Sequence, residues 1–221
     1  MISLQDVSFR YQRDKWLFKH LNLEIKQNLI TFIVGPNGGG KTTLGKLMAG
    51  ILKPQAGTVL VDGLNTKDVA LAEIGARIGY LFQEPERQIF AASVRDEIAF
   101  ALELRGISQE EINTKVDAVL KQFQLEQLAN LSPIKLSRGE KQRLAIAAIM
   151  VNQPRFFILD EPTTGLDRER KGILSSVIEK LKDEGIGMVI ISHDQYFVQR
   201  HAQQIITVAG GEIVDVASCS T

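Results

Sequence analysis

A glycine-rich loop between a strand pattern and a helix pattern constrains the fold of this chain more than any other feature. Residues 29–34 form a continuous apolar run, which is typical of a strand buried on both faces of a sheet. Beyond the loop, apolar residues recur at helical spacing from Leu44 to Ile51, and Pro54 follows the expected helix end. A buried strand that leads through a loop into a helix predicts an α/β core.

The loop itself has the composition of a phosphate-binding site. It fits the pattern G-x-x-x-x-G-K-[ST] and reads Gly35-Pro36-Asn37-Gly38-Gly39-Gly40-Lys41-Thr42, followed by Thr43. Glycines let backbone N–H groups curl around phosphates, and the helix that follows adds the positive end of its dipole. We expect Lys41 to reach the β- and γ-phosphates and the Thr42 hydroxyl to ligate Mg²⁺. The alternative is a glycine-rich turn without function, and the strand–loop–helix setting disfavours it.

A second apolar strand pattern ends in two acidic residues. Residues 156–159 are apolar, and Asp160, Glu161 and Pro162 follow. A carboxylate at a strand end can complete a Mg²⁺ shell, so Asp160 is predicted to be a metal ligand. Glu161 is expected to point differently, toward the attacking water, and is predicted to be the general base that activates it. Taken alone, the same pattern also fits a strand cap and a turn.

The chain is expected to form a single domain in which a helical lobe is inserted into an α/β core. Strand patterns fill the first third and return after residue 153, whereas residues 85–153 carry helical patterns, including one expected helix over 112–128. We predict a core of residues 1–84 and 154–221, with a helical lobe over 85–153. Near the end of the chain, Gly210-Gly211 predicts a hairpin.

Composition excludes several classes of function. Lys+Arg and Asp+Glu both number 26, so net charge gives no case for general nucleic-acid binding. No apolar run approaches the ~18 residues that span a bilayer, and the first residues lack the basic opening of a signal peptide. The single cysteine, Cys219, cannot form an internal disulfide, which fits a reducing, cytosolic environment. We therefore expect no direct membrane insertion, and any membrane role must come through a partner.

A second glycine motif lies between the loop and the acidic strand. Residues 136–143 read Leu-Ser-Arg-Gly-Glu-Lys-Gln-Arg. Ser137 and Glu140 have capping-box spacing ahead of a helical run. The motif can simply start a helix, and a capped helix N-terminus beside a glycine can also bind an anion.

Together these motifs resemble the ATP-binding cassette (ABC) family, in family order and over essentially the whole chain. The resemblance implies a P-loop NTPase (RecA-like) core with an N-terminal antiparallel β region and an inserted α-helical lobe. It implies an ATPase that uses ATP and Mg²⁺. It also implies that Ser137 and Gly139 contact the γ-phosphate of a nucleotide held by a second ABC ATPase subunit, either an identical chain or a paralogue.

The resemblance assigns roles to four further residues. Tyr11 matches the aromatic residue that stacks on adenine, although a strand aromatic can equally be packed. Gln83 matches the glutamine that contacts Mg²⁺ and joins the core to the helical lobe. Asp167 matches the loop that crosses to the opposite subunit, and His193 matches the histidine that contacts the γ-phosphate.

The second glycine motif departs from the family at two positions. The common form is Leu-Ser-Gly-Gly-Gln, whereas this chain has Arg138 and Glu140. The positions that touch phosphate in the family, Ser137 and Gly139, are retained. Arg138 can add favourable charge or face solvent, and Glu140 places a negative charge near a phosphate.

The segment Gln83–Phe90 resembles the ATPases of energy-coupling-factor (ECF) importers, including the cobalt-type CbiO proteins. There a Pro-x-x-Gln-x-Phe stretch forms a short helix that docks an integral membrane coupling subunit. The resemblance implies a peripheral protein on the cytoplasmic face of the cell membrane that drives import of a vitamin or metal ion. The alternative is an ordinary helix start in which Ile89, Phe90 and Phe100 belong to the core.

Three classes of function follow. The first is the energy subunit of an ECF-type or other ABC transporter. The second is a soluble ABC ATPase that acts on DNA or ribosomes, and such proteins usually carry a long coiled-coil insertion or two linked cassettes. The third is a nucleotide-binding regulator without turnover, which the presence of Lys41, Asp160, Glu161 and His193 disfavours.

Overall fold

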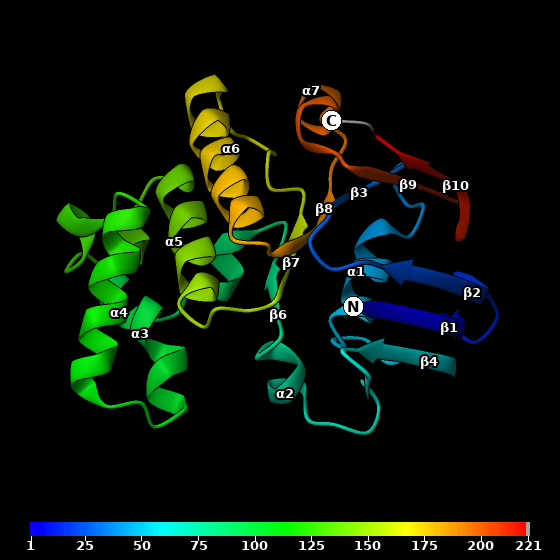
Figure 1. The fold of residues 1–221 in the computed structure, drawn as a ribbon, viewed down its shortest axis with the longest axis horizontal. Helices are drawn as coiled ribbons and strands as arrows, with labels where there is room; N and C mark the ends of the chain where they lie inside the picture. Colours follow the sequence, from blue (N-terminus) through cyan, green and yellow to red (C-terminus); the bar gives the residue numbers. More distant parts are fainter. Residues whose placement is uncertain (220–221) are drawn as a thin grey trace. The chain divides into compact units, whose positions relative to one another are not determined.

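The computed structural model describes residues 1–219 and divides into two compact units. The first unit holds Met1–Tyr80 and the chain from Arg155 onward, and the second holds Leu81–Pro154. These divisions lie a few residues from the boundaries expected at 84/85 and 153/154. Figure 1 shows that the first unit combines strands with helices and that the second unit is helical.

The first unit contains a four-stranded antiparallel sheet in the order β2-β1-β4-β5. Its strands are β1 (Ile2–Phe9), β2 (Phe18–Ile25), β4 (Ala56–Val61) and β5 (Leu64–Asn65). Ile2 pairs with Ile25 on one side and with Val61 on the other. The antiparallel β region expected near the N-terminus is therefore confirmed.

The larger sheet of this unit has six strands in the order β10-β9-β3-β8-β7-β6. They are β3 (Ile30–Val34), β6 (Ile78–Leu81), β7 (Phe156–Asp160), β8 (Gly187–Ile191), β9 (Gln204–Ala209) and β10 (Glu212–Ser218). Strand β3 runs parallel to β8 and β9, and β7 runs parallel to β8. The expected hairpin joins β9 to β10 at Gly210 and Gly211, which have φ of 59° and 83°.

Helix α1 (Lys41–Met48) lies between the two sheets (Figure 1). Its Leu44, Leu47 and Met48 are fully buried in one core cluster with residues of both sheets. Helix α7 (Gln195–His201) covers another face, because Phe197 packs edge-on against Phe32 of β3 at 6.3 Å. The remaining helices of this unit are α2 (Leu71–Gly75) and α6 (Arg168–Asp183).

The second unit is built from helices α3 (Val94–Leu104), α4 (Gln109–Gln122) and α5 (Arg138–Met150), with short 3-10 turns η1 (Pro85–Gln88), η2 (Glu126–Leu128) and η3 (Pro133–Lys135). A serine side chain caps each α-helix here, as oxygen acceptors do at helix starts. The single helix expected over 112–128 is wrong at its end. Helix α4 stops at Gln122, and Gln124 adopts a positive φ of 54° that a helix cannot continue. Within residues 1–219, no helix has both the length and the apolar character needed to cross a bilayer.

Candidate nucleotide-binding site

The carboxyl ends of the parallel strands in the first unit gather most of the predicted site residues. Strand β3 runs into the glycine loop, β7 ends at Asp160, and β8 is followed by Ser192 and His193. Ligands of open α/β sheets bind at this edge, because loops from neighbouring strands meet there. The fold therefore places residues from three distant parts of the sequence around one position.

The glycine loop has the backbone freedom that its sequence predicts. Gly35, Gly38 and Gly40 have φ of 138°, 75° and 104°, a region that favours glycine. At Gly35 a Cβ atom would lie 2.0 Å from the carbonyl oxygen of Val208, so no side chain fits. Helix α1 starts directly after the loop, and no side chain caps its N-terminus. Its first N–H groups are therefore available to a phosphate.

Lys41 is held inside the loop. Its Nζ donates hydrogen bonds to the carbonyl oxygens of Gly35 at 2.9 Å and Pro36 at 3.0 Å, and the residue is buried. An ammonium group has three N–H donors, so one remains for a phosphate oxygen. The lysine is thus positioned in advance for an anion in the loop.

Thr42 and Asp160 form a pair of oxygen ligands between the loop and β7. The Thr42 hydroxyl donates to Oδ1 of Asp160 at 3.1 Å, and the Tyr80 hydroxyl donates to Oδ2 at 3.2 Å. Burial raises the pKa of Asp160, the two hydrogen bonds oppose this shift, and the charge of Glu161 adds to it. Burial and the charge of Asp160 also raise the pKa of Tyr80, which keeps its hydroxyl protonated as a donor.

These oxygen donors fit Mg²⁺. The ion prefers hard oxygen ligands, and it usually takes one or two carboxylates together with substrate phosphates. In residues 1–219, no group of three or more His, Cys, Asp or Glu side chains could hold a metal by itself. A hydroxyl and one buried carboxylate beside a phosphate loop match the partial protein shell that Mg²⁺ accepts.

Glu161 has a backbone conformation that sets its side chain apart from that of Asp160. Its φ is 51°, which is unfavourable for a residue other than glycine, and its N–H donates to the Ile191 carbonyl oxygen at 2.8 Å. The nearly buried carboxylate places Oε2 2.8 Å from Nδ1 of His193. This is ion-pair distance, although the two atoms are out of line for a hydrogen bond. The His193 side chain is 66% exposed, so this pair lies at the mouth of the site.

Tyr11 lies beside the loop and presents an aromatic surface to solvent. Its hydroxyl is 3.1 Å from Oγ1 of Thr43, and the residue is 64% exposed. The ring packs edge-on against Phe9 at 4.9 Å, which leaves ring surface uncovered. An exposed ring next to a phosphate loop suits stacking on a nucleotide base.

Asp167 lies at the start of helix α6 and is exposed. Its Oδ1 accepts a hydrogen bond from the Arg170 N–H at 2.9 Å, and Oδ2 lies 3.3 Å from Nη1 of the same arginine. Both oxygens therefore stabilise the first turn of the helix. Asp167 is a helix cap in this structure.

The second glycine motif and Gln83 belong to the second unit. Ser137 caps α5 in a complete capping box, in which Oε2 of Glu140 accepts from the Ser137 N–H at 2.7 Å. Gly139 is buried in the first turn. Gln83 is exposed in a bend before η1. The structure thus brings Lys41, Thr42, Asp160, Glu161, His193 and Tyr11 together within one unit, and places Gln83, Ser137 and Gly139 in the other.

Sequence reasoning missed two supporting residues. Tyr80 is the third member of the Thr42–Asp160 group, and only its place near a strand end hinted at this contact. The N–H of Gly211 in the β9–β10 hairpin donates to the Gly39 carbonyl oxygen at 3.3 Å, so the hairpin braces the phosphate loop. The hairpin was predicted, but no local pattern predicted what it touches.

Comparison with known proteins identifies the class. The family model described as ABC transporter matches residues 18–164, more than half of the chain. An ABC transporter ATP-binding protein of Pyrococcus furiosus is 42% identical over 213 residues, which cover 96% of this chain and 82% of that protein. The ATP-binding cassette MJ0796, solved as a dimer in a post-hydrolysis state with ADP and Pi, superposes with a TM-score of 0.88 at 27% identity and full coverage of both chains. The chain belongs to the ABC transporter family and is an ATP-binding ATPase subunit of a transporter.

Within this family the chain is similar to ECF-type ATPases. The energy-coupling factor transporter ATP-binding protein EcfA of Methanothermobacter thermautotrophicus is 36% identical over 217 residues, with 97% of this chain and 70% of that protein covered. CbiO1 from Clostridium perfringens, part of the ABC transporter complex cbiONQ, has a TM-score of 0.88 and 31% identity, with 98% and 88% coverage. The expected resemblance to ECF and CbiO proteins is confirmed.

Proposed function

We propose that this chain is the Mg-ATP-hydrolysing energy subunit of an ECF-type importer of a vitamin or metal ion. The observation that carries the proposal is the Lys41, Thr42, Asp160 and Glu161 group at the carboxyl edge of one sheet. Such a group suits phosphoryl transfer, where catalysis consists mostly of positioning and charge stabilisation. Similarity to EcfA and CbiO1 supports the transporter type.

Nucleotide binding follows from the loop and its neighbours. The backbone of Gly35–Thr43 surrounds the phosphates, Lys41 donates to the β- and γ-phosphates, and Tyr11 stacks on adenine. Thr42, Asp160 and Gln83 would hold Mg²⁺, which would supply positive charge against the phosphate oxygens.

Hydrolysis is assigned to Glu161 and His193. The Glu161 carboxylate accepts a proton from water, and the water oxygen bonds to the γ-phosphorus. The bond from the γ-phosphorus to its bridging oxygen breaks, and its electron pair leaves with ADP. His193 contacts the γ-phosphate, and its Nδ1, 2.8 Å from Glu161, also orients the base.

A second cassette completes the site. Ser137 and Gly139 contact the γ-phosphate bound by the partner cassette, and Asp167 lies on the loop that crosses to it. MJ0796 was solved as a dimer, which supports such an arrangement. The partner is a second copy of this chain or a paralogue.

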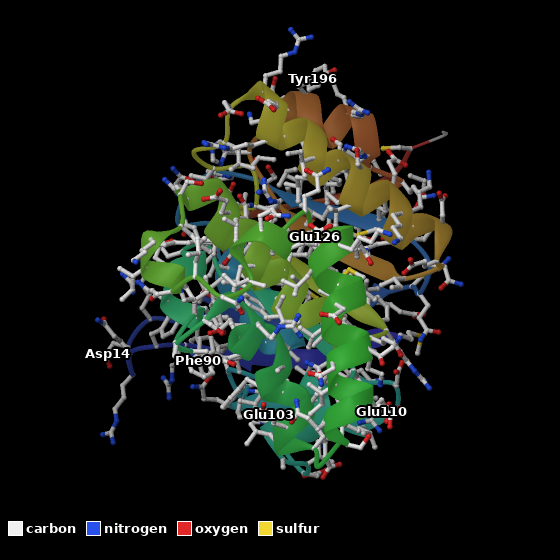
Figure 2. All side chains as sticks on the ribbon, turned by 90° about the vertical axis from the view of Figure 1, so that its left-hand side faces the viewer. Asp14, Phe90, Glu103, Glu110, Glu126 and Tyr196 are labelled. Carbon is white, nitrogen blue, oxygen red and sulfur yellow. The ribbon has the colours of Figure 1, made fainter. Side chains whose placement is uncertain are left out.

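The membrane partner is an integral coupling subunit that binds through Gln83–Phe90. Here η1 (Pro85–Gln88) precedes Phe90, which is 65% exposed and visible at the surface in Figure 2. A pocket of about 160 Å³ lies beside it, lined by Ile89, Phe90, Pro133 and Ile134 among others. An aromatic side chain this exposed fits the core alternative poorly. The chain is then peripheral, on the cytoplasmic face of the cell membrane.

Two other functions remain as alternatives: the ATPase of another ABC importer or exporter, and a soluble ABC ATPase. The segment around Phe90 distinguishes them, because a soluble ATPase has no membrane subunit to dock. Specificity for the cargo would lie in other subunits.

Two experiments test the proposal. The Glu161→Gln variant should bind ATP and lose hydrolysis by at least about a hundredfold, and unchanged turnover would show that the base is misassigned.

The second experiment is co-purification from the native membrane with Phe90→Ala, using the exposed Leu104→Ala of the same unit as control. Loss of an integral membrane subunit with the first variant alone is expected. Recovery of the wild-type chain without any membrane protein would contradict the transport role.

A further inference from the structure

Helix α6 has a row of polar residues that contact α7. These residues are distinct from the apolar residues that α6 buries in the core. Lys171, Ser175 and Glu179 recur every four residues and so share one face of the helix. Leu174, Ile178 and Leu181 are the buried apolar residues of the same helix. Each polar residue of this row contacts α7 or its cap. Figure 1 shows the two helices as neighbours in the first unit.

The first contact is an ion pair between Lys171 and Asp194. Nζ of Lys171 donates to Oδ2 of Asp194 at 2.6 Å, and the Asp194 side chain is only 15% exposed. The other oxygen, Oδ1, accepts from the Phe197 N–H at 3.1 Å and caps α7. Burial alone would raise the pKa of Asp194, but the bonds from Lys171 and Phe197 outweigh it and lower this pKa. The Asp194 carboxylate is therefore stabilised in its ionised form and held by two donors.

The second contact lies further along both helices, at Ser175 and Glu179 of α6 and at His201, the last residue of α7. Nε2 of the buried His201 is 2.8 Å from Oγ of the buried Ser175, and its Nδ1 is 2.9 Å from Oε1 of Glu179. The histidine ring also packs against Phe197 at 4.6 Å between ring centres. The two helices are therefore fastened at two points, which limits their rotation relative to each other.

The Lys171–Asp194 contact lies next to two loops of the candidate site, the loop that ends at Asp167 and the loop that contains His193. The Lys171 N–H donates to the Asp167 carbonyl oxygen at 3.0 Å, so Lys171 is one turn from that loop. Asp194 is the residue after His193, and its N–H donates to Oγ of Ser192 at 3.1 Å. The Lys171 side chain thus connects the helix turn that follows Asp167 to the residue that follows His193.

We propose that Lys171 is a positioning residue that ties the Asp167 loop to the His193 loop, so that the two loops keep one relative placement. The inference rests on the proposed function, in which Asp167 faces the partner cassette and His193 faces the γ-phosphate. A change at the partner's side then reaches this chain's own hydrolytic group through the Lys171–Asp194 ion pair, which is the α6–α7 contact nearest to both loops. The proposed function assigns Lys171 no contact with the nucleotide, and its Nζ and N–H donate to Asp194 and to the Asp167 carbonyl oxygen, so it acts through the loops.

The test compares Lys171→Met with Lys180→Met in the full chain. Lys180 pairs with Glu184 on the same helix at 4.0 Å, and that ion pair does not involve α7. For Lys171→Met we expect kcat for ATP to fall about tenfold, because small misplacements of catalytic groups are costly. The KM for ATP should stay within about twofold, since the nucleotide-binding groups are untouched. Lys171→Arg should restore kcat, and Lys180→Met should match the wild type.

Hydrogen–deuterium exchange of the nucleotide-free chain gives a readout that is independent of turnover. Faster exchange in both loops, 163–167 and 192–195, in Lys171→Met but not in Lys180→Met supports the positioning role of Lys171. Exchange and kcat equal to those of Lys180→Met overturn it, and so does faster exchange confined to α6. The Glu161→Gln variant tests the proposed function separately from the role of Lys171. If Glu161→Gln hydrolyses ATP normally, the proposed function fails, while the exchange comparison still decides the role of Lys171.

Discussion

The hydroxyl of Thr42 and the carboxylate of Asp160 lie 3.1 Å apart although 118 positions separate them in the sequence. The contact joins the end of the phosphate loop to the end of β7, and the Tyr80 hydroxyl adds strand β6 to the group. It places an almost fully buried carboxylate next to the loop. A buried charge destabilises a fold unless it is compensated, so we expect this site to reduce stability before ligand binds.

Replacing Asp160 with Asn should therefore stabilise the nucleotide-free protein, by about 1 kcal/mol. The folded-state pKa of Asp160 is raised above its ordinary value of 3.8. The stability of the wild type thus falls as pH rises from the ordinary pKa through the raised folded-state pKa of Asp160. The gain in Asp160→Asn should be largest near neutral pH and should shrink as pH falls toward 4, as urea unfolding at several pH values would reveal.

The exposed Asp215→Asn is the control for the loss of a negative charge and should leave stability unchanged. Asp160→Asn should also lose ATP hydrolysis. A variant that is less stable than the wild type at every pH would mean that hydrogen bonds from Thr42 and Tyr80 outweigh the cost of burial.

Gly211 and Gly210 form a matched pair in the hairpin that braces the loop. A Cβ atom on Gly211 would lie 1.7 Å from the Leu17 carbonyl oxygen at a φ of 83°, whereas Gly210, with φ of 59°, has open space. We expect Gly211→Ala to destabilise by more than about 2 kcal/mol and Gly210→Ala by about 1 kcal/mol. Gly211→Ala should also weaken ATP binding, because its N–H bonds the loop at Gly39. Denaturant unfolding and nucleotide titration measure both effects, and equal losses in the two variants would contradict the role of the hairpin.

The sequence was sufficient for the elements whose signals are local. The strand–loop–helix unit, the Asp160 strand and the capping box at Ser137 depend on neighbouring residues, and each is present. Tyr80 and Gly211 could not be assigned, because their contacts depend on tertiary placement of residues 80 and 172 positions apart in the chain. The end expected for the helix over 112–128 was wrong, because Gln124 has a left-handed conformation that its residue type does not predict.

Tyr11 provides a test of base recognition that is separate from phosphate binding. The Tyr11→Ala variant removes the exposed ring and should weaken ATP binding by roughly tenfold, the lower end of what base stacking contributes. Tyr11→Phe keeps the ring, loses only the contact with Thr43, and should stay within about twofold of the wild type. Binding of inorganic triphosphate should be the same in all three proteins. If Tyr11→Ala weakens triphosphate as much as ATP, the tyrosine supports the loop and does not recognise the base.

Glu140 allows the structural and functional roles of the second glycine motif to be separated. Its Oε2 accepts from the Ser137 N–H at 2.7 Å, and the Ser137 side chain accepts from the Glu140 N–H at 3.4 Å. Glu140→Ala removes one of these bonds and should destabilise by about 1 kcal/mol. Glu140→Gln keeps an oxygen acceptor in the same position and should preserve stability.

Glu140→Gln also tests whether the second glycine motif approaches a phosphate. If Ser137 and Gly139 contact the partner's γ-phosphate, the carboxylate of Glu140 repels that phosphate, and Glu140→Gln should raise kcat/KM for ATP about threefold. The exposed Glu126→Gln of the same unit, labelled in Figure 2, is the control for net charge and should have no effect. A rise in kcat/KM in both Glu140→Gln and Glu126→Gln would point to a general electrostatic effect. An unchanged kcat/KM in Glu140→Gln with preserved stability would mean that the motif caps a helix and does not approach a phosphate.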